Sequence, residues 1–398
     1  MPRLVRDRLT WLLYAQLGVY GYFLYGINPS IPLLREEQDV SRTVAGLHGT
    51  VLALGALGAG FLYARLAGRL GRRPVLWGGL VCVCLGVVVY TATTALPVTL
   101  FGALLSSLGG SAVVIGTAAA LSDHHGPAGP AAVSEANACA AGLGLLAPLA
   151  LGAFVSSGLG WRAALLVTLV LVGVLGVVMG RVPFPAARPH EAVPEAVRGS
   201  RSLPTRYWWA WGVLVLCIGV EFSLAIWASD VLRQNTGASS GVAATGVTAM
   251  VGGMFVGRTV GARLSLRFSP DRVMYGALAT AVAGFAVFWT STTTALAMGG
   301  LVLCGLGMAL HFPVGIVRAI RASAGRTDLA AGRASLAAAL AIGAGPFVLG
   351  ALSDLAGPHR ASLIVPGMLS VAGVLVYLSR VPVSPRRSGE RVVPPRSP

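Results

Sequence analysis

The sequence contains no lysine and little charge of any kind. Arginine supplies all 30 basic residues, and only 11% of the 398 residues are charged. Without lysine, the chain cannot contain the Gly-Lys-Ser/Thr loop that holds the phosphates of ATP. A phosphate-binding loop of this type is therefore excluded.

Cysteine is also scarce. All five cysteines lie inside long apolar runs: Cys82, Cys84, Cys139, Cys217 and Cys304. A cysteine in such a run behaves as a small apolar packing residue. We therefore expect no disulfide, no metal site and no cofactor.

Long apolar runs are what the sequence has in abundance. Hydrophobic residues make up 55% of the chain, and a helix that crosses a bilayer needs about 20 of them in succession. Single spans are predicted at 9–34, 43–64, 136–160, 163–180, 207–232, 234–257, 334–353 and 361–379. Two longer runs, 74–122 and 273–317, each hold a pair of spans that fold back at 91–97 and at 291–294. The total is twelve transmembrane helices.

The chain repeats itself at an offset of 198 residues. Ala64-Arg65-Leu66 aligns with Ala262-Arg263-Leu264, and Arg162 aligns with Arg360. We therefore predict an all-α membrane protein with two pseudo-symmetric six-helix bundles. The expected units are a bundle over 1–180, a cytoplasmic linker over 181–206, a bundle over 207–381 and a disordered cytoplasmic tail over 382–398.

The arginines predict the orientation in the membrane. With the N-terminus inside, 25 of the 30 fall on cytoplasmic segments, as the positive-inside rule requires. The exceptions are Arg35, Arg42, Arg162, Arg233 and Arg360. We expect both termini in the cytoplasm and the chain in a bacterial-type inner membrane. The net charge of +16 is spread over many short loops, so its partner is the lipid bilayer and not a nucleic acid.

Two patterns typical of enzymes occur in the wrong context. Residues 237–241 match a nucleophile elbow, but they lie in a turn between spans. Residues 142–147 resemble a dinucleotide fingerprint, but they lie inside an apolar helix, where small residues favour close helix packing. We therefore do not expect an enzyme.

The turn between spans 2 and 3 carries a family resemblance. Residues 64–73 resemble the cytoplasmic signature of the major facilitator superfamily, G-x-x-x-D-R/K-x-G-R-R/K, with matches at Arg69, Gly71, Arg72 and Arg73. Gly68 replaces the usual Asp and Ala64 the usual Gly, and a degenerate copy follows span 8. The alternative is an arginine-rich turn that only obeys the positive-inside rule.

A second partial match lies in span 5 and is repeated in span 11. Pro148 and Gly152, with their mates Pro346 and Gly350, resemble the Gly-Pro motif of the antiporter branch. Proline bends a helix, and small residues let another helix approach. Ordinary helix packing is the alternative. Span 4 departs from the family, because Leu105 stands where an arginine is expected.

The resemblance implies a monomeric secondary transporter whose halves rock about a central cavity lined by spans 1, 4, 7 and 10. By resemblance, the candidate cavity residues are Gln16, Tyr22, Tyr25, Asn28, Ser107 and Trp227. Aromatic faces with few charges suit a small amphipathic substrate. His311 is a candidate partner for a proton carrier.

Glu221 is the strongest candidate for proton coupling. It lies near the middle of an apolar span, where a charge costs on the order of 3 kcal/mol and usually has a function. Desolvation disfavours its anion, so it can take up a proton on one side and release it on the other. Its repeat mate is Phe23. The alternative is a structural carboxylate bonded to a neighbouring helix.

Glu135, near the cytoplasmic end of span 5, is a candidate for an inner gate. The family fold packs span 5 against span 8, which carries Arg258 and Arg263 toward its cytoplasmic end. We predict that Glu135 pairs with one of these arginines when the cavity faces outward. Alternatively, these side chains reach only the headgroups and water.

The sequence therefore predicts a secondary active transporter that exports a small amphipathic compound in exchange for protons. A proton symporter or facilitator that imports a small metabolite is the main alternative. A membrane receptor without transport activity is a more remote one, because a fold does not fix function.

Overall fold

The computed structural model describes residues 4–184, 203–324 and 327–380, and the regular elements in these ranges are helices. The first half contains α1 (Arg8–Gln38), α2 (Arg42–Leu70), α3 (Arg72–Thr91), α4 (Leu96–His125), η1 (Gly126–Ala128), α5 (Gly129–Ser156) and α6 (Trp161–Met179). The second half contains α7 (Thr205–Thr236), α8 (Ser240–Ala244), α9 (Gly246–Arg267), α10 (Pro270–Thr290), α11 (Thr294–Met308), α12 (His311–Ala322), α13 (Thr327–Ala356), α14 (Pro358–Ala361) and α15 (Ile364–Leu378).

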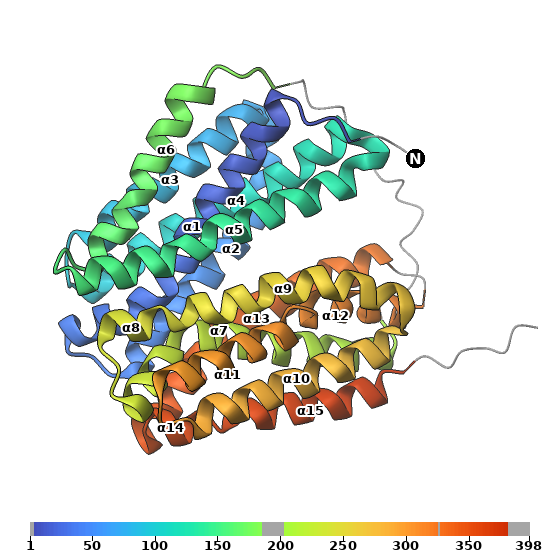
Figure 1. Ribbon diagram of the computed structural model, residues 1–398. Helices are drawn as coiled ribbons and strands as arrows, with labels where there is room; N and C mark the ends of the chain where they lie inside the picture. Colours follow the sequence, from blue (N-terminus) through green and yellow to red (C-terminus); the bar gives the residue numbers. More distant parts are fainter. Residues whose placement is uncertain (1–3, 185–202, 325–326, 381–398) are drawn as a thin grey trace, which may run out of the picture.

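The helices form two bundles, as predicted. Helices α1 to α6 form one bundle and α7 to α15 the other (Figure 1). Three spans of the second bundle are each built from two helices: α8 with α9, α11 with α12, and α14 with α15. The parts of the predicted linker and tail at 185–202 and 381–398 lie outside the described residues.

Eleven helical segments in the described ranges are long and apolar enough to cross a membrane. The remaining long helix is α1, whose 31 residues carry no charge between Arg8 and Arg35. Tyr14, Tyr20, Tyr22 and Tyr25 lower its hydropathy, yet its residues are buried on most sides. The polar character of α1 is therefore accommodated inside the first bundle, and α1 is its sixth span.

The observed helices are longer than most of the apolar runs that predict them. For example, the run at 43–64 becomes α2, Arg42–Leu70, because its polar ends continue the helix beyond the apolar part. The predicted start of span 8 at 234 is wrong. Residues 234–236 still belong to α7, which ends at Gly237 in a left-handed conformation (φ +66°) that glycine adopts readily.

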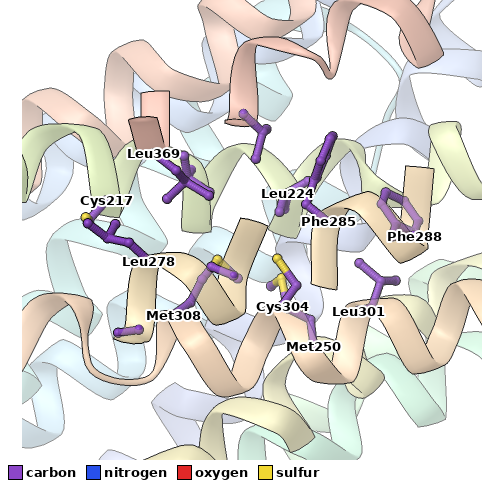
Figure 2. Close-up of a cluster of buried hydrophobic side chains, with 14 of the residues drawn as sticks. Cys217, Leu224, Met250, Leu278, Phe285, Phe288, Leu301, Cys304, Met308 and Leu369 are labelled. Atoms are coloured by element: carbon purple, nitrogen blue, oxygen red, sulfur yellow. The ribbon is translucent and has the colours of Figure 1, made fainter. Parts of the chain in front are cut away.

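A large apolar core holds the second bundle together. Its members come from α7, α9, α10, α11 and α15, and Figure 2 shows Phe285, Phe288, Cys304 and Met308 among them. Cys217 and Cys304 are fully buried there as free thiols. This is the packing role that the sequence predicts for cysteines in apolar runs.

The two bundles meet mainly at one end. Gly46 and Gly49 of α2 lie against Pro346 and Phe347 of α13, and Thr50 donates its hydroxyl to the carbonyl of Gly343 at 2.9 Å. We call this end, formed by 35–50, 226–245 and 343–354, the closed end. In Figure 1 the bundles diverge from it toward the opposite end, which carries Arg69, Arg72 and Arg73 and which we call the arginine-rich end.

Candidate functional site

Three polar side chains from three helices meet near the middle of the spans. Glu221 lies halfway along α7 and Arg258 lies on α9, and their charges interact. Arg258 also interacts electrostatically with the hydroxyl of Tyr25, which belongs to α1 of the other bundle. We call Tyr25, Glu221 and Arg258 the mid-span cluster. It links the two halves at the depth where a substrate site is expected.

Tyr25 reaches the second bundle because α1 and α5 pack closely behind it. A Cβ atom on Gly144 of α5 would lie 2.2 Å from the Cδ2 atom of Tyr25. The ring therefore occupies space that only a glycine leaves free. Tyr25 and Leu145 also pack against the apolar core of the second bundle.

The side chains of the cluster are not fully enclosed by the protein. Arg258 is exposed, and Glu221 and Tyr25 are partly exposed. Because Arg258 interacts with a residue of the opposite bundle, it faces the space between the halves and not the lipid. The charges of Glu221 and Arg258 balance each other in this arrangement. A proton on Glu221 would remove the charge that balances Arg258, and a change at either group would alter the other.

Three predicted cavity residues instead hold helices together. The hydroxyl of Tyr22 donates to the carbonyl of Ala164 in α6 at 2.9 Å, and the Ser107 hydroxyl donates to the carbonyl of Leu52 in α2 at 2.5 Å. The indole of Trp227 donates to the carbonyl of Pro346 at 2.8 Å. All three side chains are buried, so Tyr25 is the predicted aromatic residue that stays accessible.

The other predicted polar residues are buried at separate places in the bundles. Gln16 is 0% exposed and Asn28 3%, and the Gln16 amide atoms and Asn28 Oδ1 have no hydrogen-bond partner among the described residues. His311 is 1% exposed and begins α12, next to the break in its span. The structure does not bring these residues together with Glu221.

Glu135 has partners within its own bundle. Arg6 donates to it at 2.6 Å and the Tyr14 hydroxyl donates to it at 3.0 Å. Arg258 lies instead in the mid-span cluster, and the side chain of Arg263 lies outside the described residues. The predicted pair between Glu135 and Arg258 is therefore not formed in this conformation, and it stays a prediction for a state open at the other end.

The signature turn between α2 and α3 holds helices together at the arginine-rich end of the first bundle. Gly71 has φ +84°, a backbone conformation that favours glycine, and it separates α2 from α3. Arg72 pairs with Asp123 of α4 at 2.5 Å, and Arg73 donates to the carbonyl of Gly180. Arg69 is exposed. The ion pair with Asp123 therefore ties the start of α3 to the end of α4.

The second bundle contains the same tie with its charges reversed. Asp271 opens α10, which is the repeat mate of α3, and it pairs with Arg318 of α12. Arg318 is buried and also donates to the carbonyl of Val376 at 2.8 Å. An ion pair thus recurs at the same end of each bundle, but not at aligned positions, because Asp271 aligns with Arg73 and Arg318 with Ala120.

The two proline and glycine motifs occupy equivalent contacts between the bundles. A Cβ atom on Gly152 of α5 would lie 2.5 Å from Thr245 Cγ2, and one on Gly350 of α13 would lie 2.6 Å from the carbonyl oxygen of Arg42. The chain continues as a helix past Pro148 and Pro346. Each glycine therefore permits a close crossing between halves, which is the packing interpretation of the motif.

An ion-pair network joins the bundles at the closed end. Arg42 donates through Nε to Asp230 at 2.9 Å, and Arg35 lies 3.8 Å from the same carboxylate. The backbone amides of Arg42 and Thr43 donate to Asp354 at 2.9 and 2.8 Å. Arg233 pairs with Glu36. We call these seven residues the closed-end network.

The closed-end network was not predicted, although the sequence contains a signal for it. Three of the arginines that violate the positive-inside pattern, Arg35, Arg42 and Arg233, are members. A fourth, Arg162, pairs with Glu37 within the first bundle. Arginines that violate the positive-inside pattern therefore indicate ion pairs. Their partners could not be predicted, because they depend on how the two bundles dock.

Comparisons with known proteins agree with this architecture. The sequence profile of the Major Facilitator Superfamily matches residues 13–229 and 209–397. The chain matches none of the curated protein sequences. Among solved structures it resembles a bacterial homologue of the human lysosomal transporter Spinster in an inward-facing, unoccupied conformation. The TM-score is 0.76 at 14% identity, over 94% of this chain and 98% of that one.

Two further similar structures are those of a nucleoside transporter and a sugar transporter. A mutant of the nucleoside transporter NupG gives a TM-score of 0.75 at 13% identity, over 94% of this chain and 98% of that one. A D-xylose-proton symporter gives 0.73 at 16% identity, over 93% and 97%. Together with the profile matches, which cover both halves, these similarities show that the chain belongs to the major facilitator superfamily.

Proposed function

We propose that this transporter exports a small amphipathic compound in exchange for protons, by alternating access. The observation that carries the proposal is the mid-span cluster, in which a carboxylate, a guanidinium and a phenol from both halves meet midway along the spans. Glu221 is the proposed proton carrier. Tyr25 supplies an accessible aromatic surface beside it for the substrate.

The conformation supports alternating access. The closed-end network and the glycine crossings join the halves at one end, while the bundles diverge at the other (Figure 1). Exposure of the cluster would then be from the arginine-rich end, which the positive-inside rule assigns to the cytoplasm. We propose that both termini are cytoplasmic and that the chain works as a monomer in an inner membrane.

The cluster suggests how proton and substrate exchange. The proton and a substrate that prefers the ionised Glu221 compete for the same group, and competition of this kind is the basis of antiport. Each must leave before the other binds, so the halves would rock in alternately loaded states. The closed-end network must break in each cycle, because it spans the two bundles.

Proton symport is the alternative that one observation favours. Arg258 next to Glu221 repels a cation and can hold an anion once Glu221 is protonated. Binding of the proton would then promote binding of the substrate. A D-xylose-proton symporter is among the structures with this fold, although at 16% identity the likeness concerns the fold alone.

Proteoliposomes with an imposed proton gradient distinguish the two mechanisms. We expect an acidic lumen to drive uptake of a transported compound, as in antiport. Uptake driven by an acidic exterior would instead establish symport. A lack of flux for a broad panel of amphipathic compounds would favour a receptor without transport activity.

We further propose that Glu135 pairs with Arg258 or Arg263 at the arginine-rich end when the protein opens at the other end. Arg6 would then release Glu135 and, if Arg258 is the partner, Arg258 would release Glu221. A charge swap between Glu135 and the arginine that pairs with it should restore part of the transport that each single reversal abolishes. If neither double variant is better than the single ones, the pairing is refuted.

A further inference from the structure

A groove of about 490 Å³ runs along the outside of the second bundle between α9 and α10. It lies at the arginine-rich end, where α9 finishes and α10 begins. Its walls include Val260 and Leu264 of α9 and Phe268 directly after it, which are 48%, 39% and 48% exposed. Because α9 and α10 belong to spans of this membrane protein, exposed apolar side chains on them suit contact with lipid chains.

Gly276 of α10 lines the groove together with Leu306 and Gly307 of α11, which packs against both α9 and α10. Gly276 of α10 is exposed, and a Cβ atom placed on it would meet nothing within 4 Å. Thr280 lies one turn deeper, and its hydroxyl is already bonded to the carbonyl of Gly276 at 2.8 Å. Among the described residues that line it between Arg272 and Thr280, the groove therefore offers mainly apolar surface.

The mouth of the groove is cationic. Arg272 lines it in the first turn of α10 and is exposed, and no acidic partner of its side chain occurs among the described residues. The neighbouring Asp271 is occupied by Arg318 and lies 3.8 Å from Arg380. Between Arg272 and Thr280 the helix rises about 12 Å, a depth that suits an acyl chain below a headgroup.

We propose that the groove between α9 and α10 binds one phospholipid with an anionic headgroup. Its phosphate contacts Arg272 and one acyl chain lies over Gly276. Basic residues at the cytoplasmic face of a membrane protein attract anionic lipids, and here the apolar groove adds a defined seat for the chain. The site is separate from the mid-span cluster and does not depend on the proposed transport mechanism.

The test uses the full-length protein in detergent with added phosphatidylglycerol or phosphatidylcholine of identical acyl chains. Native mass spectrometry counts bound lipids, and thermal unfolding measures stabilisation. We expect phosphatidylglycerol to bind roughly fivefold more tightly, the factor expected for one arginine at an anionic surface. Glycerol phosphate alone, which has the headgroup but no chain, should not stabilise the protein.

Two variants separate the headgroup from the chain. Arg272→Gln should remove the preference for phosphatidylglycerol, and Gly276→Leu should reduce the binding of both lipids. Arg321→Gln and Gly299→Leu are the matched controls, because Arg321 is exposed outside the groove and Gly299 has open space at the far end of α11. Equal binding of both lipids to the wild type, or an unchanged preference in Arg272→Gln, would overturn the proposal.

Discussion

Asp7 shows how a single residue secures the start of α1. It accepts a hydrogen bond from the amide of Thr10 at 2.9 Å and another from His124 of α4 at 2.7 Å. Burial alone would raise the pKa of Asp7, but the bonds from Thr10 and His124 bring it below its ordinary value. The ionised form of Asp7 is therefore the one that stabilises the fold.

The protonation of Asp7 should be visible in the pH dependence of stability. A lowered pKa contributes stability above the ordinary pKa of about 4, and this is lost as the pH falls through the folded value. Asp7→Asn should lower the melting temperature at pH 6 and reduce its further fall toward acid. Asp7→Ala should cost about 1 kcal/mol more, because it also loses the helix cap. Identical pH profiles for wild type and Asp7→Asn would contradict this role.

Arg318 is a buried charged side chain that ties the ends of helices together. Its replacement by glutamine removes the ion pair to Asp271 and the bonds to α15 and Ser379. We expect a loss on the order of 2 kcal/mol, since buried partners are left unsatisfied. Arg321→Gln, on the exposed face of the same helix, should change thermal stability little. Equal melting temperatures for the two variants would refute the structural importance of Arg318.

At the residue scale, a charge inside an apolar run could be identified as a candidate site from the sequence. The partner of each side chain could not be predicted. Glu221 stands out in the sequence because insertion of a charge is costly, but its contact with Arg258 depends on the rotation of α7 against α9. Likewise, Gln16, Asn28 and Trp227 were placed in the cavity from span number alone. In the structure their side chains are buried inside the protein and do not line a cavity with Glu221.

At the scale of elements, the helices could be predicted and their crossings only partly. Apolar length gave the spans, and the 198-residue offset gave the pairing of Gly152 with Gly350. The breaks at Thr245, at 309–310 and at 362–363 could not be predicted, because no proline and no charged residue stands at these positions. The small residues indicated close packing, but only the structure shows which helices cross there.

The glycine crossings should control the balance between states. Gly350→Ala places a Cβ atom 2.6 Å from the carbonyl oxygen of Arg42, and such overpacking typically costs about 1–3 kcal/mol. Because this crossing exists only while the closed end is closed, the population should shift toward opening there. The distance between spin labels at Thr94 and Thr292, one on each bundle, should lengthen.

The matched control for this crossing is Gly142→Ala. Gly142 lies on α5, and a Cβ atom there meets nothing within 4 Å. The label distances in this variant should equal those of the parent protein. An unchanged distance in Gly350→Ala as well would show that this crossing does not limit opening.

For the whole molecule, the closed-end network should act as a lock. Asp230 has a side chain only 4% exposed, and it holds both Arg42 and Arg35 across the interface. In Asp230→Asn both arginines lose this partner, while Arg35 still lies near Glu36 and Arg42 near Asp354. The loss affects the closed state only, so we expect about a tenfold shift toward opening. The same pair of spin labels measures it. Arg360→Gln, an exposed change at this end, should have no effect, and a similar response in both variants would argue against a specific lock.

The central claim is that Glu221 couples the proton gradient to movement of the substrate. The most direct measurement compares wild type and Glu221→Gln in proteoliposomes with an imposed proton gradient, using a compound that the wild type accumulates. Glutamine keeps the size and polarity of the side chain but cannot release a proton. We predict that the variant still equilibrates the compound down its own gradient but no longer accumulates it. Accumulation at the wild-type rate and with the wild-type pH profile would contradict the claim.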